Sequence, residues 1–236
     1  MRGFRSAGVM VAAALLAAGC GGSGSREPTA ATTPPKVHST ARPTCLTGDS
    51  DGTAVWAGDT QVLLLGSGSK GIVLAPQIDG NACSWTDEMH RLAKAGYRVA
   101  VVSYEDDRSK SLPAAVRVLR ANGAAKVVLM GASAGGGLVV DQAGGISPAP
   151  VGVIAVSPVE VWPQRPGPEA YRGPVLLLES KSDPSAPLSD VKALVGRHPG
   201  GAESLYFDGD DHGYSLVMLQ HKARPAIDAF LKKTLG

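Results

Sequence analysis

The chain has 236 residues, with 23 Lys and Arg against 21 Asp and Glu, so its formal net charge is +2. Hydrophobic residues make up 44% and charged residues 19%, a balance that supports a packed core and excludes a wholly disordered chain. Basic residues are neither in excess nor interleaved with aromatic ones, so no nucleic-acid partner is expected. The three cysteines and five histidines show no CxxC or HxxxH spacing, so no metal site is expected either.

The first twenty residues have the order of a bacterial export signal. Arg2 and Arg5 precede an apolar run over 8–18, which is shorter than the roughly 20 residues that span a bilayer. The run ends in Gly19-Cys20 and resembles a lipobox, where cleavage precedes the cysteine and its thiol receives a lipid. We therefore expect a signal peptide over 1–19 and lipidation of Cys20. An ordinary cleaved signal with an incidental cysteine, giving a secreted protein, is the alternative.

Residues 20–42 are rich in Gly, Ser, Thr, Ala and Pro and hold hardly any large apolar side chain. Such a segment cannot bury enough surface to offset the entropy of ordering it. We expect a lipidated, flexible tether over 20–42 and a folded domain over 43–236. The protein is then exported and held by its lipid on the extracytoplasmic face of the cell membrane.

Two cysteines remain in the expected domain if Cys20 is lipidated. Cys45 and Cys83 are then an even pair in an oxidising compartment, which predicts a disulfide between them. Because spacing alone does not establish a bridge, two buried free thiols are the alternative.

The domain begins with two short apolar runs, 61–65 and 71–75, whose glycine- and serine-containing connection is typical of a hairpin. Beyond them, apolar strands alternate with segments of helical spacing. This alternation predicts an α/β fold with a doubly wound, mostly parallel sheet covered by helices on both faces. The predicted strands lie at 97–103, 126–130, 151–156, 175–179 and 204–207, and the predicted helices at 85–95, 112–121, 134–142, 188–196 and 215–235.

A Gly-x-Ser-x-Gly pentapeptide, 131–135, directly follows the strand 126–130. In a nucleophile elbow the serine lies in a strained turn between a strand and a helix, and small neighbours are needed because the two backbones crowd there. The helix that follows favours negative charge at its N-terminus. The position of the motif predicts that Ser133 is a nucleophile, and a glycine-rich turn with a stray serine is the alternative.

A nucleophilic serine needs a base, and the base needs an acid to orient it. Asp183 and His212 each follow a predicted strand, so both should reach the sheet edge that carries Ser133. We expect His212 to be the base and Asp183 the acid. The remaining histidines, His38, His90, His198 and His221, lie in the tether, in helices or before a turn, and other nearby carboxylates leave the acid open: Glu179, Asp190, Asp210 and Asp211.

Two backbone N–H groups are expected to bind the oxyanion of the tetrahedral intermediate. One is the N–H of Ala134, directly after Ser133. The second should belong to the loop after 71–75, where we favour Ile78, with Gln77 close behind. The same loop also fits an ordinary turn, because backbone donors demand no particular side chain.

Only eighteen residues, five of them proline, separate the strands 151–156 and 175–179. They are too few and too stiff for a sizeable lid domain. Their larger apolar side chains form either a wall of an open pocket or ordinary loop packing: Val159, Val161, Trp162 and Tyr171.

The strand order, elbow, acid and histidine resemble the α/β-hydrolase superfamily over about residues 46–235. The compact layout is similar to dienelactone-hydrolase-like and small lipase-like members. The resemblance implies Ser133 as nucleophile, Asp183 as acid, His212 as base, and no metal or organic cofactor. Many members carry His-Gly where this chain has Pro76-Gln77, and this departure bears on the second oxyanion donor.

These features together predict a serine hydrolase of the carboxylesterase or lipase type, which cleaves a carboxylic ester or thioester through an acyl-enzyme intermediate. Its expected partners are a small-molecule or lipid ester and, through the anchor, the membrane. An acyltransferase that uses the same triad is one alternative. A non-catalytic binding lipoprotein that keeps the fold is another.

Overall fold

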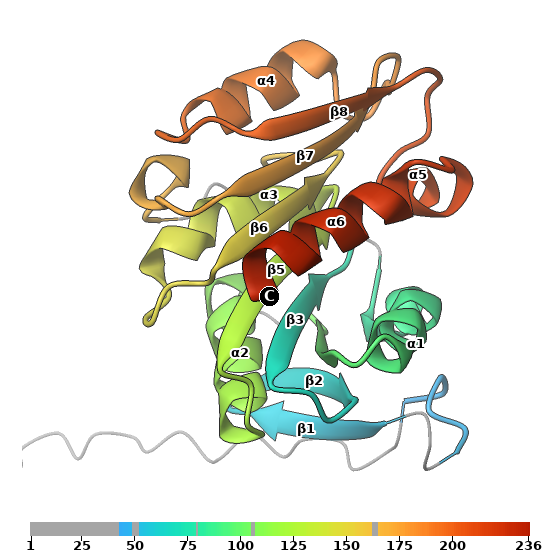
Figure 1. Ribbon diagram of the computed structural model, residues 1–236, viewed down its shortest axis with the longest axis vertical. Coiled ribbons are helices and arrows are strands. Elements are labelled where there is room, and N and C mark those ends of the chain that lie inside the picture. The colour runs from blue at the N-terminus through green and yellow to red at the C-terminus, as the bar shows by residue number, and fades with distance from the viewer. Residues whose placement is uncertain (1–42, 49–51, 79, 105–106, 162–164) are drawn as a thin grey trace, which may run out of the picture. The chain divides into compact units, whose positions relative to one another are not determined.

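A mixed sheet of eight strands is the framework of the computed structural model (Figure 1). The strands lie in the order β1-β2-β4-β3-β5-β6-β7-β8, and the six from β4 to β8 in this order run parallel. β1 and β2 are antiparallel additions at one edge. The strand bounds are Thr53–Ala57 (β1), Thr60–Leu65 (β2), Lys70–Ala75 (β3), Arg98–Val102 (β4), Lys126–Ala132 (β5), Gly152–Val156 (β6), Val175–Ser180 (β7) and Glu203–Phe207 (β8).

The structure describes residues 43–48, 52–78, 80–104, 107–161 and 165–236. All of them belong to one compact unit, His38–Gly236. The expected signal peptide, the lipidation site Cys20 and the tether lie outside the described residues. Within the described residues, no helix has both the length and the apolar character needed to cross a bilayer.

Helices cover both faces of the sheet, as the alternating pattern predicts. Figure 1 shows α6 crossing the front of the sheet with α1 beside it, while α2 and α3 lie behind. Each face has its own apolar core, one packed against α2, α3 and α4 and the other against α1, α5 and α6. The helices are Thr86–Lys94 (α1), Ser111–Ala121 (α2), Ala134–Gln142 (α3), Leu188–Gly196 (α4), Tyr214–Leu219 (α5) and Ala223–Leu235 (α6).

The predicted hairpin between the first two apolar runs is wrong. β2 pairs with β1 and, in antiparallel register, with β4, which separates it from β3. The glycines of the connection serve a close approach instead of a tight turn: a Cβ on Gly68 would lie 2.1 Å from the carbonyl oxygen of Gly96. β1, an edge strand with two exposed residues and without a continuous apolar run, is not predicted from the sequence.

The predicted C-terminal helix 215–235 is two helices, α5 and α6. Gln220 has extended backbone angles and ends α5. Pro225, the third residue of α6, fits the first turn of a helix but would clash with the carbonyl four residues earlier inside a continuous one. The break therefore has a local cause in the sequence.

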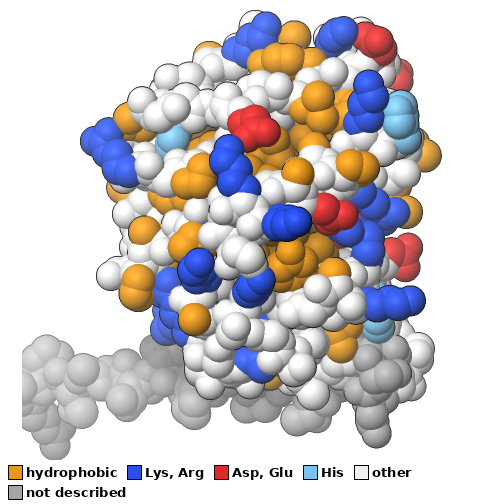
Figure 2. All heavy atoms as spheres, viewed as in Figure 1, with side chains coloured by type: hydrophobic (Ala, Val, Ile, Leu, Met, Phe, Trp, Pro, Cys, Tyr) orange, Lys and Arg blue, Asp and Glu red, His pale blue; other side chains and the backbone are white. Residues whose placement is uncertain are grey.

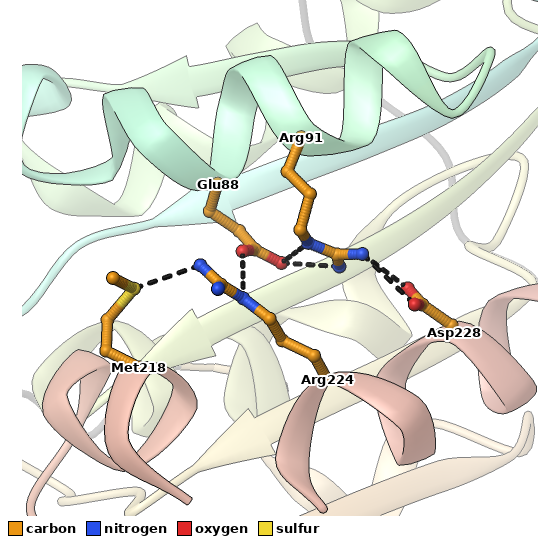
Figure 3. A network of polar contacts seen from close by, with 5 residues as sticks. All are labelled: Glu88, Arg91, Met218, Arg224 and Asp228. Carbon is orange, nitrogen blue, oxygen red and sulfur yellow. Dashed lines mark hydrogen bonds and ion pairs between the residues drawn. The ribbon is translucent and has the colours of Figure 1, made fainter. Parts of the chain in front are cut away.

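A buried carboxylate joins α1 to α6 (Figure 3). Glu88, with a side chain 0% exposed, accepts hydrogen bonds from Arg91 at 2.6 Å and from Arg224 at 3.1 Å. Arg91 continues the network to Asp228 at 2.8 Å. Because the charge of Glu88 is met by two guanidinium groups, the pairing offsets the cost of burying it. On the outside of this face, acidic and basic side chains are interspersed with apolar ones (Figure 2).

The predicted disulfide between Cys45 and Cys83 is present. It links the first described residues to the short 3-10 helix Ala82–Trp85, which follows the loop after β3. A bridge between residues 38 apart restricts the unfolded chain and so stabilises the fold. The N-terminal segment is thereby held beside the loop after β3.

Candidate active site

The junction of β5 and α3 has the geometry of a nucleophile elbow. Ser133 lies between them with φ 54° and ψ −123°, angles that a non-glycine residue rarely adopts. A Cβ on Gly131 would lie 2.2 Å from the carbonyl oxygen of Gly135, and one on Gly135 would lie 2.2 Å from that of Ala75. Both glycines of the motif are therefore required by the crowding of backbone against backbone.

Ser133 is 7% exposed and stands at the N-terminus of α3. Ala134 is the first residue of that helix, and the first N–H groups of a helix have no partner within it. Together with the helix dipole, such groups favour negative charge beside Ser133. Val159, in the segment after β6, holds the elbow, since its N–H donates to the carbonyl oxygen of Ser133 at 3.0 Å.

The structure brings the predicted acid and the predicted base together. Asp183 follows β7 and His212 follows β8, and 2.6 Å separates Asp183 Oδ2 from His212 Nδ1. The other oxygen, Asp183 Oδ1, accepts from the N–H groups of Ser185 and Ala186. The Asp183 side chain is 0% exposed and the His212 side chain 26%. An ionised Asp183 only accepts hydrogen bonds, so Nδ1 of His212 carries the proton and Nε2 is left as the base.

The neighbouring acids are engaged elsewhere. The Asp211 carboxylate accepts from Gln220, and its backbone carbonyl accepts from the Ser180 hydroxyl at 2.7 Å. Asp210 is exposed. Among the described residues, only Asp183 makes a carboxylate contact with the imidazole of His212.

Ser133 Oγ and His212 do not form a hydrogen bond with each other, although strand register carries both to one sheet edge. Hydrogen bonds of this kind are often long without substrate and tighten in the reacting complex. The geometry therefore provides the elbow and the oriented base as two parts that substrate would complete.

The loop after β3 lies against both parts. The Tyr104 hydroxyl donates to the Pro76 carbonyl at 2.8 Å, and burial raises the pKa of Tyr104. The Gln77 side chain faces Gly213, beside His212, at 3.2 Å from the position of a Cβ there. Ile78 is 46% exposed. The loop therefore lies near the elbow and the histidine loop, and the oxyanion role of the N–H groups of Gln77 and Ile78 stays a prediction.

The apolar residues of the segment after β6 do not share one role: one lines a cavity and another is part of the core. Val159 lines a cavity of about 550 Å³ bounded by α4 and by the residues after Asp183. Tyr171, by contrast, is core: it is 2% exposed and its hydroxyl donates to the Pro150 carbonyl at 3.0 Å. Val161 is 40% exposed, and Trp162 lies outside the described residues.

A second buried carboxyl lies beside Asp183. Glu179, in β7, is fully buried, and burial together with the charge of Asp183 raises its pKa to about 8. Sequence reasoning treated Glu179 only as an alternative acid. Its signal was a charged residue near the end of an otherwise apolar strand, VLLLES, where burial on both faces is expected.

No group of three or more His, Cys, Asp and Glu side chains in the described ranges is arranged to hold a metal ion. The acidic residues at the site are instead engaged with an imidazole, with backbone N–H groups and with each other.

Solved structures with this architecture were found by comparison. A predicted CIB-like hydrolase from Thermoplasma acidophilum is 22% identical, with a TM-score of 0.61 over 76% of this chain and 97% of that one. Native esterase 2 of Thermogutta terrifontis is 16% identical, with a TM-score of 0.63 over 78% and 92%. MGS-MChE2, an α/β-hydrolase enzyme from a lagoon-sediment metagenome of Mar Chica, Morocco, is 14% identical, with a TM-score of 0.60 over 77% and 98%.

No protein-family model and no curated protein sequence matches the chain significantly. What the chain shares with the similar structures is therefore the fold, at identities of 22% and below.

Crowding at the elbow is testable by adding one methyl group. Gly135→Ala places its Cβ 2.2 Å from Ala75 O and 2.4 Å from Pro76 O, both backbone atoms. We expect the free energy of unfolding in urea to fall by about 3 kcal/mol or more. Gly196→Ala, in α4, is the control because nothing lies within 4 Å of its Cβ position. Equal urea midpoints for the two variants would contradict the steric account.

Proposed function

We propose that this chain, which has the α/β-hydrolase fold, is a serine hydrolase that cleaves a carboxylic ester or thioester. The observation that carries the proposal is the 2.6 Å contact of Asp183 with His212, at the sheet edge where Ser133 occupies a strained elbow. An oriented imidazole and a serine held in a strained strand-to-helix turn are the two parts that nucleophilic catalysis by serine requires.

In the proposed reaction, Ser133 Oγ attacks the substrate carbonyl while Nε2 of His212 accepts its proton. The N–H of Ala134 and one from the loop after β3 bind the oxyanion that forms. His212 then returns the proton to the leaving alcohol or thiol, and an acyl group remains on Ser133. Water, activated by the same imidazole, releases the acid and restores the enzyme.

Two further observations support this function. Asp183 holds two backbone N–H groups as well as the imidazole, so its carboxylate is fixed before substrate binds. The structures similar to this chain include T. terrifontis esterase 2 phosphorylated by paraoxon and phosphonylated by sarin. The reaction of that protein with organophosphates agrees with the nucleophilic role that we propose for Ser133.

Substitutions at the triad test the proposal through hydrolysis of a short p-nitrophenyl ester. Ser133→Ala and His212→Ala should abolish turnover. Asp183→Asn should lower kcat by about three to four orders of magnitude, because the imidazole loses its orienting charge. Asp211→Asn is the matched control in the histidine loop and should cost about tenfold or less, as a surface charge effect. A crippled Asp211→Asn with a mild Asp183→Asn would show that the acid is assigned wrongly.

We also propose that the enzyme works at a membrane surface, held by lipidated Cys20. The support is the sequence alone: two arginines, a short apolar run and the Gly19-Cys20 ending. Expressed in a bacterium, the wild-type protein should partition into the detergent phase and Cys20→Ala into the aqueous phase. Ser23→Ala, three residues on, is the control and should behave as wild type. A wild-type product in the aqueous phase, with an N-terminus other than residue 20, would contradict the anchor.

A further inference from the structure

Glu179 is a buried carboxyl group that the reaction above does not use. It is 0% exposed, on the face of the sheet that α3 and α4 cover. One oxygen, Oε1, accepts from the N–H of Ser180 at 2.9 Å. The other, Oε2, is buried and has no hydrogen-bond partner among the described residues. An ionised carboxylate in this position would leave an oxygen uncompensated in the protein interior.

The row of strand ends places Glu179 directly beside the triad. Ser133 N–H bonds to the carbonyl of Val156, and Ser157 N–H bonds to the carbonyl of Leu178, each at 2.9 Å. Ser133, Ser157 and Glu179 are therefore neighbours across the ends of β5, β6 and β7.

Asp183 is the charged group whose proximity raises the pKa of Glu179. From β6, Ser157 presents a hydroxyl, whose smaller effect favours the ionised form of Glu179. Tyr206 is the register partner from β8. The cations of the α4 side are turned to other groups: Lys192 lies 5.2 Å from the Tyr206 ring, and Arg197 pairs with the acids Glu160 and Asp141.

Two neighbouring buried carboxyl groups cannot both be ionised at low cost, and Glu179 has no ion-pair partner among the described residues. Asp183 already accepts three hydrogen bonds, from two backbone N–H groups and from His212, which stabilise its charge. Glu179 accepts only one from a backbone N–H group. The proton therefore belongs on Glu179.

We propose that Glu179 is a positioning residue of the site: it stays protonated and donates its hydrogen to Asp183, so that the pair presents a single negative charge to His212. The inference rests on the proposed function for its role in turnover, but not for the location of the proton. Burial first, and then the charge of Asp183, raise the pKa of Glu179 from 4.5 to about 8, in agreement with a protonated group at neutral pH.

The retained proton makes stability depend on pH with a definite sign. Between pH of about 4.5 and about 8, folded Glu179 holds a proton that the unfolded chain has released. The contribution of this proton to the free energy of unfolding is fully present below about pH 4.5 and is lost as the pH rises toward about 8. Above about pH 8 the folded protein releases the proton too, and the dependence ends.

Two substitutions separate the proton from the volume of the side chain. Glu179→Gln keeps a donor toward Asp183 and an acceptor for Ser180, and has no proton to lose. Glu179→Leu fills similar space with neither. Urea unfolding is measured from about pH 5.5 to about pH 7.5, and the unfolding constant of wild type should rise about tenfold per pH unit relative to that of Glu179→Gln. A ratio that stays flat over this range would overturn the proposal.

Turnover of p-nitrophenyl acetate at pH 7 gives the second readout. Glu179→Gln should keep kcat within about threefold of wild type, whereas folded Glu179→Leu should lose about tenfold or more because Asp183 has lost its donor. Equal kcat values for the two variants would overturn the positioning role. An inactive wild type would count against the hydrolase proposal, and the ratio of unfolding constants, which needs no activity, would still decide where the proton resides.

Discussion

The parallel register of β5, β6, β7 and β8 is the constraint on which the site depends. Hydrogen bonds from Ser133 to β6 and from Ser157 to β7 continue the ladder past the last strand residues, so the strand ends stop in one row. The residues that follow must leave the sheet there, in the strained turn at Ser133 or in the loops that hold Asp183 and His212. The same register that pairs apolar strands thus collects the polar groups at one edge.

Charge at this edge is organised by burial. Asp183 and Glu179 are enclosed, while the His212 side chain is partly exposed. The Asp183 carboxylate is fixed by two backbone N–H groups and by the imidazole of His212, and no Lys or Arg pairs with it among the described residues. Two other connections lie farther from the site. The disulfide holds the loop after β3, and the Glu88 network holds α6 against α1.

Sequence reasoning succeeded where the signal is local. The elbow glycines, the helix after Ser133 and the acid and histidine after their strands were predictable, because each is a short pattern at the end of an apolar run. It failed where the partner is distant: whether β2 pairs with β3 or β4 depends on contacts between residues 34 to 40 positions apart. The environment of Glu179 could not be predicted for the same reason. Only the folded sheet buries Glu179 and brings it beside Asp183 and Ser157.

Covalent trapping of the nucleophile tests whether Ser133 is the residue that His212 activates. The folded protein is treated with a fluorophosphonate probe, digested, and the modified peptide is sequenced by mass spectrometry. The account predicts one adduct per chain, on Ser133, absent from Ser133→Ala and strongly slowed in His212→Ala, because the base is needed to activate the hydroxyl. A folded protein that stays unlabelled, or carries its adduct on another residue, would contradict it.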